Sequence, residues 1–280
     1  MPEVSKASGI MDKRRIMVNR KEHAEKICIQ SEKGFLFDNK TELEKVNNIV
    51  NPDLTNLIII NNRHKTSLKV WQKNTIDALM RIMNMNKNAL TGVLNFASYR
   101  HAGGGFIKGS FAQEEALCHS TNLYTALEKE QQWYDNHEKN LNQYLYGNEA
   151  VLSENVTIIA DSNFIPVKAD RAYKTDVLTC AAPNRKAALK RYPDISRKAD
   201  EAMYSRADYI LSIFALKDYD SLILGAFGCG VFGNNPQYTA ECFKSLLENK
   251  YKGVFKEIIF AIPDNKNFGY FDECLKNSEN

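Results

Sequence analysis

The sequence lacks the features that mark a nucleic-acid binder, a membrane protein or a metalloenzyme. Lys and Arg number 37 against 34 Asp and Glu, which leaves a formal net charge of only +3. Dedicated nucleic-acid binders show a strong basic excess instead. No apolar run has the length of a membrane span, and the N-terminus shows no signal peptide. The five histidines lack metal-binding spacings such as H-E-x-x-H. We therefore expect no membrane partner, no strong nucleic-acid signal and no metal.

The cysteines are also informative through what they do not form. There are six, far apart and without a C-x-x-C pair: Cys28, Cys118, Cys180, Cys229, Cys242 and Cys274. A chain of 280 residues does not need disulfides to be stable. The pattern predicts free thiols in a reducing compartment, and hence a cytoplasmic protein.

The chain length and composition predict one large globular domain with additions. Apolar residues make up 44% and charged residues 25% of the 280 residues, a balance typical of globular proteins. There is no internal repeat and no low-complexity linker. We expect residues 1–11 to be disordered. The polar, Tyr- and Asn-rich segment 128–148 reads as an insertion or a long helix end.

Strand-like and helix-like segments mostly alternate along the chain. The predicted strands are Asn56–Asn61, Leu68–Trp71, Leu90–Ala97, Val156–Ala160, Val177–Ala181, Ser221–Gly225 and Ile258–Ile262. The predicted helices are Lys13–Glu32, Asn74–Met85, Ser110 to about Tyr146 with breaks, Ser196–Leu216, Pro236–Asn249 and Phe268–Lys276. Alternation predicts a largely parallel sheet with helices on both faces. Ligands bind such sheets at the carboxyl ends of the strands, where both glycine-rich loops of this chain fall.

The first loop combines three glycines with an acidic helix start, HAGGGFIKGSFAQEEAL. Ser110 and Gln113 have capping-box spacing, which predicts a helix starting at Ser110. Glu114 and Glu115 then lie about 100° apart around the axis, so they cannot do the same job. Acids in a first turn also simply complement the helix dipole. Three consecutive glycines favour a pocket wall, and a carboxylic acid there is suited to glycoside hydrolysis.

The second loop reads GAFGCGVFGNNP and lies between a predicted strand and a predicted helix. Its glycines match G-x-G-x-x-G, the dinucleotide fingerprint, but the loop comes late in the chain and lacks the expected acid about 20 residues on. The general property of such a loop is an anion site made of backbone N–H groups beside a helix N-terminus. Phe227 and Phe232 either pack on a sugar or belong to the core.

Together the two loops resemble the microbial type of poly(ADP-ribose) glycohydrolase, a branch of the macrodomain fold. That family is marked by three glycines, a spacer of six to eight residues and Gln-Glu-Glu. Here seven residues separate Gly103–Gly105 from Gln113-Glu114-Glu115. The strand ending LNFAS and the second loop are also similar, and the likeness spans most of the chain. The family's proline before the glycines is replaced by Ala102.

The resemblance implies an α/β fold: a three-layer α/β/α macrodomain-like fold with a mixed, mostly parallel sheet and extra N-terminal helices. Residues 12–280 would form a single catalytic domain, acting as a monomer and without a cofactor. It implies hydrolysis of ribose–ribose bonds in poly(ADP-ribose), with Glu115 as general acid and Glu114 beside it. The implied substrate-binding residues are Asn95, Gly103, Gly104, Gly105, Gln113, Gly225, Phe227, Gly228, Cys229, Gly230, Val231, Phe232 and Gly233.

Several alternatives stay open at this point. The same site could remove single ADP-ribose units from macromolecules, or bind ADP-ribose without cleaving it; the complete Gln-Glu-Glu favours an enzyme. A nicotinamide-dependent oxidoreductase is the third interpretation. His119 lies one turn after Glu115 and could face the site, although such residues more often pack. A nucleophilic Cys229 lacks an evident base. Asn184 follows a strand, where turn formation is the commoner role.

Overall fold

The computed structural model describes residues 19–86 and 89–276. The predicted disorder of residues 1–11 lies outside these ranges. A helix runs through residues 19–33, which agrees with the described part of the predicted Lys13–Glu32 helix. The remaining α-helices are α2 (Thr75–Met85), α3 (Gln113–Ser120), α4 (Leu123–Leu127), α5 (Gln131–Lys139), α6 (Arg185–Arg191), α7 (Ser196–Leu216), α8 (Pro236–Glu248) and α9 (Asn265–Lys276).

Seven strands form one mixed sheet in the order β1-β4-β5-β3-β6-β7-β2. Their bounds are β1 (Asn47–Val50), β2 (Ser67–Trp71), β3 (Thr91–Phe96), β4 (Ala150–Thr157), β5 (Lys174–Cys180), β6 (Ser221–Leu224) and β7 (Glu257–Ala261). The pairings β1–β4 and β4–β5 are antiparallel, and the other four are parallel. The predicted mixed, mostly parallel sheet is confirmed.

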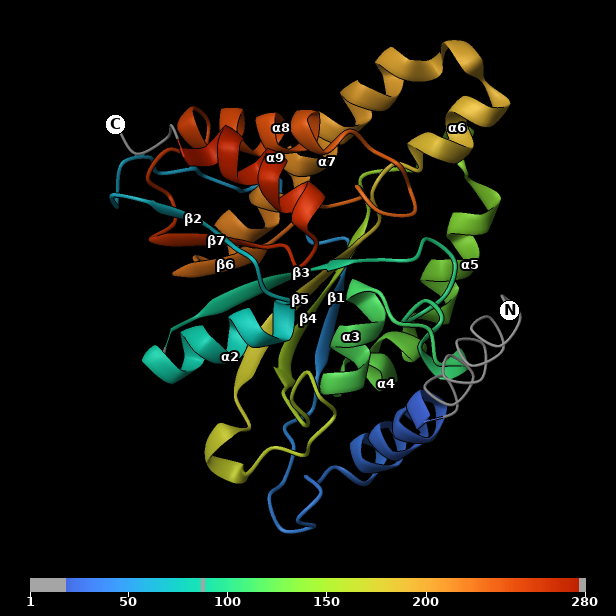
Figure 1. Cartoon of the computed structure of the whole chain (residues 1–280), viewed down its shortest axis with the longest axis vertical. Helices are drawn as coiled ribbons and strands as arrows, with labels where there is room; N and C mark the ends of the chain where they lie inside the picture. Colours follow the sequence, from blue (N-terminus) through green and yellow to red (C-terminus); the bar gives the residue numbers. More distant parts are fainter. Residues whose placement is uncertain (1–18, 87–88, 277–280) are drawn as a thin grey trace, which may run out of the picture.

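Helices cover both faces of the sheet, which gives the predicted three layers (Figure 1). Side chains along a strand point alternately to opposite faces. In β3, Leu94 therefore packs into the core under α7, α8 and α9, whereas its neighbour Val93 packs with α2, α3, α4 and helix 19–33. The same alternation holds for Ile258 and Ile259 in β7. Two separate cores clamp the sheet and fix the position of its strand ends.

Two predicted element positions are wrong. Asn56–Asn61 forms no strand: Ile58 is 81% and Ile60 61% exposed, and only Ile59 of these three packs against a core. Its apolar run therefore never pairs with the sheet. The strand predicted at Val156–Ala160 begins earlier, at Ala150. β1 and α6 were not predicted. All six cysteines are free thiols, as expected.

Candidate active site

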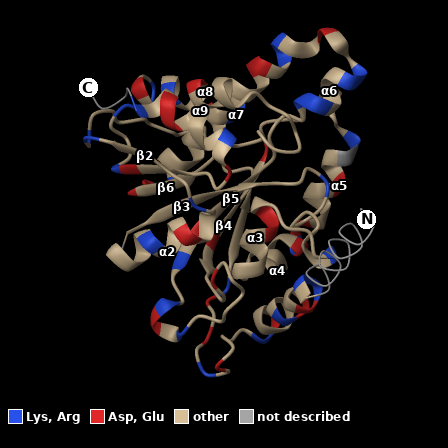
Figure 2. Cartoon of the chain, in the orientation of Figure 1, with Lys and Arg blue, Asp and Glu red and all other residues tan. Residues whose placement is uncertain are grey.

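A cavity of about 710 Å³ opens at the carboxyl edge of the parallel strands. Segments that directly follow β3, β5, β6 and β7 contribute to its walls, for example Ser98, Ala182, Phe227 and Pro263. Convergence of these segments is expected, because parallel strands end at the same edge of the sheet. Figure 2 shows that charged residues gather mainly on peripheral helices, whereas the start of α3 places acidic residues near the centre.

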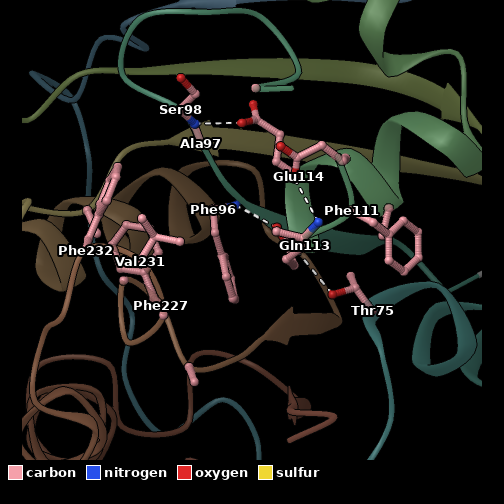
Figure 3. Close-up of a pocket in the computed structure, with 18 of the residues that line it drawn as sticks. Thr75, Phe96, Ala97, Ser98, Phe111, Gln113, Glu114, Phe227, Val231 and Phe232 are labelled. Atoms are coloured by element: carbon pink, nitrogen blue, oxygen red, sulfur yellow. Dashed lines mark hydrogen bonds between the residues drawn. The ribbon is translucent and has the colours of Figure 1, made fainter. Parts of the chain in front are cut away.

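Gln113 fixes the start of α3 against the end of β3. Its Oε1 accepts the backbone N–H of Phe96 (2.8 Å) and its Nε2 donates to Thr75 Oγ1 (3.2 Å), as Figure 3 shows. The same Nε2 also donates to the Leu94 carbonyl (2.8 Å). The Gln113 amide therefore joins β3, α2 and α3. Although Gln113 lines the cavity, these three bonds occupy its oxygen and both of its N–H groups with protein partners.

The helix starts three residues later than the sequence predicts. α3 begins at Gln113, and its N-cap is Ala112, not Ser110. The reason is that Gln113 bonds to β3 instead of forming a box with Ser110. Glu115 takes over the capping role: its Oε2 accepts the backbone N–H of Ala112 at 2.9 Å.

Glu115 is anchored at both carboxyl oxygens yet still lines the cavity. While Oε2 caps the helix, Oε1 accepts the backbone N–H of Gly105 at 2.9 Å. The residue is 9% exposed, and its neighbours in the cavity wall include Gly104, Lys108 and Ala112. These contacts hold one carboxyl group in a fixed orientation at the cavity surface.

Glu114 lies deeper and is held differently. The backbone N–H of Ser98 donates to its Oε2 (2.6 Å), and Asn95 Nδ2 donates to its Oε1 (3.3 Å). Burial raises the pKa of Glu114 to about 8; the bond from Ser98 opposes this rise and the nearby Glu115 contributes to it. The Glu114 carboxyl is therefore protonated at neutral pH. Asn95 also donates to Thr179 Oγ1 (3.2 Å) and is fully buried.

The three glycines of the first loop are packed against these acids and against α3 and α4. Gly104 has φ +59°, and a Cβ there would lie 2.7 Å from Glu115 Oε1 and 3.0 Å from Glu114 Oε2. Gly103 has φ +63°, and its Cβ would meet the Tyr124 ring at 2.7 Å. A Cβ on Gly105 would overlap Ser110 Oγ. The backbone approaches the acids this closely only because side chains are absent.

The second loop is organised around Asn234, which sequence analysis did not identify. The Asn234 side chain is buried, and its Nδ2 donates to the carbonyls of Pro183 (2.7 Å) and Gly228 (3.0 Å). Gly228 has φ +72°, and its Cβ would lie 2.5 Å from that nitrogen. Asn235 accepts the backbone N–H of Gln237 (2.9 Å), so it caps α8.

Aromatic and aliphatic side chains form the wall next to this loop. Phe227 is fully buried and meets Phe96 edge-to-face with ring centroids 5.7 Å apart. The ring of Phe232 meets that of Tyr146 edge-to-face, with the ring centroids 6.3 Å apart. Val231 is 81% exposed although it lines the cavity. Figure 3 shows these side chains on the side of the cavity opposite to Gln113 and Glu114.

The structure brings most of the predicted site residues to the cavity. The lining includes Gly104, Gly105, Gln113, Glu114, Glu115, Phe227, Gly228, Gly230, Val231 and Phe232. The other predicted residues, which do not line it, are Asn95, Gly103, Gly225, Cys229 and Gly233. Asn95 and Gly103 stand directly behind the acids and glycines that do.

The structure shows the environments of three other residues that the sequence singled out, Cys229, His119 and Asn184. Burial raises the pKa of the Cys229 thiol to about 12. His119 does not line the cavity; it is buried among Phe106, Phe164 and other rings, and burial lowers its pKa to about 4. Asn184 caps α6 by accepting the backbone N–H of Ala187 (3.1 Å).

Several further residues line the cavity without having been predicted as site residues: Asn74, Thr75, Ser98, His101, Lys108, Phe111, Pro263, Asp264 and Asn267. The sequence did contain a signal for Ser98 and Pro263, because each directly follows a predicted strand.

In the described part of the chain, no three His, Cys, Asp or Glu side chains are grouped to hold a metal ion. Within those same residues, no helix is both long and apolar enough to cross a membrane.

The fold and the cavity define a macrodomain-like α/β protein. Two acidic residues, at the start of α3, line a cavity at the carboxyl edge of its parallel strands. The model of the family "Microbial-type PARG, catalytic domain" matches residues 20–161. The chain belongs to this family, the microbial-type poly(ADP-ribose) glycohydrolases. A search of curated proteins found no match.

Solved structures agree with this assignment. The poly(ADP-ribose) glycohydrolase from Thermomonospora curvata is 26% identical with a TM-score of 0.82, covering 91% of this chain and 99% of that chain. The structure of the same enzyme bound to the inhibitor ADP-HPD is 26% identical with a TM-score of 0.78, and the match covers 91% of this chain and 98% of that chain. The Deinococcus radiodurans enzyme in complex with ADP-ribose is 30% identical with a TM-score of 0.69, covering 79% and 88%.

Proposed function

We propose that this protein is a poly(ADP-ribose) glycohydrolase, which hydrolyses ribose–ribose O-glycosidic bonds and releases ADP-ribose. The observation that carries the proposal is the Glu115 carboxyl, fixed by two backbone N–H groups at the surface of a cavity that is also lined by the glycine-rich second loop. Family membership and the similarity to enzymes solved with ADP-ribose and ADP-HPD support it.

ADP-ribose would lie across the strand ends. Its diphosphate contacts the backbone of the Gly228–Gly233 loop, where N–H groups beside the start of α8 favour an anion. Its terminal ribose lies between Gly104 and the two acids. Phe227 and Phe232 then form the apolar wall beside the sugar, and the exposed Val231 meets the bound molecule from the loop tip.

Glu115 acts as general acid and then as general base. Its carboxylic acid donates a proton to the glycosidic oxygen as the bond to the ribose anomeric carbon breaks, which leaves an oxocarbenium-like ribose. Water adds to that carbon and gives its proton to the Glu115 carboxylate, which restores the acid.

Glu114 holds a ribose hydroxyl. Because burial keeps it protonated at neutral pH, its O–H donates to the hydroxyl oxygen and adds no second negative charge beside Glu115. Asn95 is a positioning residue that acts through Glu114, since it bonds that carboxyl from behind. Gln113 has the same kind of role, because it fixes the start of the helix that carries both acids.

Release of ADP-ribose from purified poly(ADP-ribose) tests the proposal, with a mono-ADP-ribosylated protein as a parallel substrate. We expect free ADP-ribose from the polymer with the wild type, and a loss of about 10³-fold or more in rate with Glu115→Ala. Binding of ADP-ribose by the wild type without release from the polymer would contradict the proposal, as would full activity in Glu115→Ala.

A further inference from the structure

The cavity continues past Glu115, on the side away from the anion loop. Lys108, Phe111 and Ala112 are among the residues that line the cavity. Phe111 is 44% exposed, which is high for a large aromatic residue. Figure 3 shows its ring at the end of the cavity opposite to Val231 and Phe232, with Glu114 between.

Distant segments hold Phe111 in place. The guanidinium of Arg20, on helix 19–33, lies over the Phe111 ring at 4.3 Å from its centroid. Phe164 meets the same ring edge-to-face at 5.7 Å. His23, also on helix 19–33, stacks on Phe164 at 4.5 Å, and its Nε2 lies 2.9 Å from the His119 carbonyl oxygen. The exposed ring is therefore part of a built aromatic cluster.

The charges around Phe111 suit an anion. Lys108 is exposed and Arg20 is partly exposed. Across residues 19–86 and 89–276, neither side chain forms an ion pair with a carboxylate. An accessible ring beside two cations that pair with no carboxylate of the described residues is the combination that binds nucleotides, because bases stack on aromatic rings or guanidinium planes while cations attract phosphates.

We propose that Arg20, Lys108 and Phe111 form a leaving-side platform, a subsite for the neighbouring ADP-ribose unit of the polymer. The adenine of that unit stacks on Phe111 and the Arg20 guanidinium, and its diphosphate contacts Lys108. The ribose of this unit carries the oxygen that Glu115 protonates, so it must leave the cavity beside Glu115. The inference rests on the proposed function and adds that helix 19–33 selects polymer over small conjugates.

Binding tests the platform without catalysis. In a Glu115→Gln background, dissociation constants are measured for ADP-ribose and for a two-unit ADP-ribose fragment. We expect Phe111→Ala to weaken binding of the fragment about tenfold and to change ADP-ribose binding much less. Ile107→Ala is the matched control: Ile107 lies in the preceding 3-10 turn (Phe106–Lys108) and is also 44% exposed, but it does not line the cavity. The platform is refuted if Phe111→Ala weakens both ligands equally or neither.

Kinetics gives an independent readout. The ratio of kcat/KM on the polymer to kcat/KM on the methyl glycoside of ADP-ribose should fall about tenfold in Phe111→Ala. It should fall less in Arg20→Ala and Lys108→Ala, by amounts that shrink as salt increases. An unchanged ratio in all three variants would overturn the platform. If the wild type cleaves neither substrate, the proposed function fails instead, and the binding comparison still decides on the platform.

Discussion

The two glycine-rich loops on opposite sides of the cavity use glycine for different purposes. In the first loop, the missing side chains let the backbone approach two carboxyl groups, since a Cβ on Gly104 would meet both Glu114 and Glu115. In the second loop, the missing Cβ of Gly228 makes room for Asn234, whose amide ties the loop to the segment after β5. Gly230 has open space around it.

This difference indicates a division of labour. The first loop positions the carboxyl groups that act on the glycosidic bond, so substitutions in this loop should affect turnover. The second loop presents its backbone to the substrate and is held by the buried Asn234, so substitutions in this loop should affect binding. The same chemical change, Gly→Ala at a positive φ, can therefore be made in both loops and should have different results.

The largest effect is expected for Gly104→Ala. The new Cβ would lie 2.7 Å from Glu115 Oε1, so the carboxyl must move, and a displacement of about 1 Å can cost about 10²-fold in rate. We expect kcat on the polymer to fall by about that factor in steady-state assays. Gly269→Ala, in α9 and with nothing near its Cβ position, is the control. Normal turnover by Gly104→Ala would disprove the close-approach argument.

Gly228→Ala should mainly weaken binding. Its Cβ would lie 2.5 Å from Asn234 Nδ2 and 2.6 Å from the Ala182 side chain, at φ +72°, where a side chain costs about 1–2 kcal/mol. We expect the Kd for ADP-ribose, measured by calorimetry, to rise about tenfold, the equivalent of about 1.4 kcal/mol. If kcat fell in this variant while Kd stayed unchanged, the division between the loops would be wrong.

A smaller effect concerns pH and Glu114. Because its pKa is raised from 4.5 to about 8 in the folded protein, the folded state holds a proton that the unfolded state loses. The stabilisation is complete below about pH 4.5 and is lost as pH rises through 8. The Tm of Glu114→Gln, relative to wild type, should therefore rise between pH 5 and pH 9, measured by calorimetric scans at each pH.

Glu25→Gln, a change at an exposed glutamate on helix 19–33, is the control for the pH series. Parallel curves for wild type and Glu114→Gln would mean that Glu114 keeps its ordinary ionisation in the fold.

The sequence was enough to predict the mixed sheet, the two loops and ten of the residues that line the cavity. α7 has the predicted bounds, and α8 starts at Pro236, because these depend on local periodicity and capping. The strand predicted at Asn56–Asn61 was wrong because an apolar run does not reveal whether a partner strand exists. β1 was missed because NNIV is short and half polar.

The details of the site could not be predicted, because they depend on contacts between distant residues. Asn234 donates a hydrogen bond to the carbonyl of Pro183, which lies 51 positions away in the sequence. Arg20, on helix 19–33, likewise contacts Phe111 although the two residues are far apart in the sequence. The capping role of Ser110 was wrong for the same reason, since Gln113 bonds to β3. Local patterns identify which residues are chemically able to act, but only the fold shows which of them meet.

The most direct test of the account uses Glu115→Gln, which keeps the shape of the side chain and removes its acidity. Turnover of poly(ADP-ribose) and the Kd for ADP-ribose are measured on the same preparation. We predict that turnover falls by about 10³-fold while Kd stays within about threefold of wild type, because the second loop holds the ligand. Retained turnover, or a loss of binding that matches the loss of turnover, would contradict the assignment of Glu115 as the proton donor.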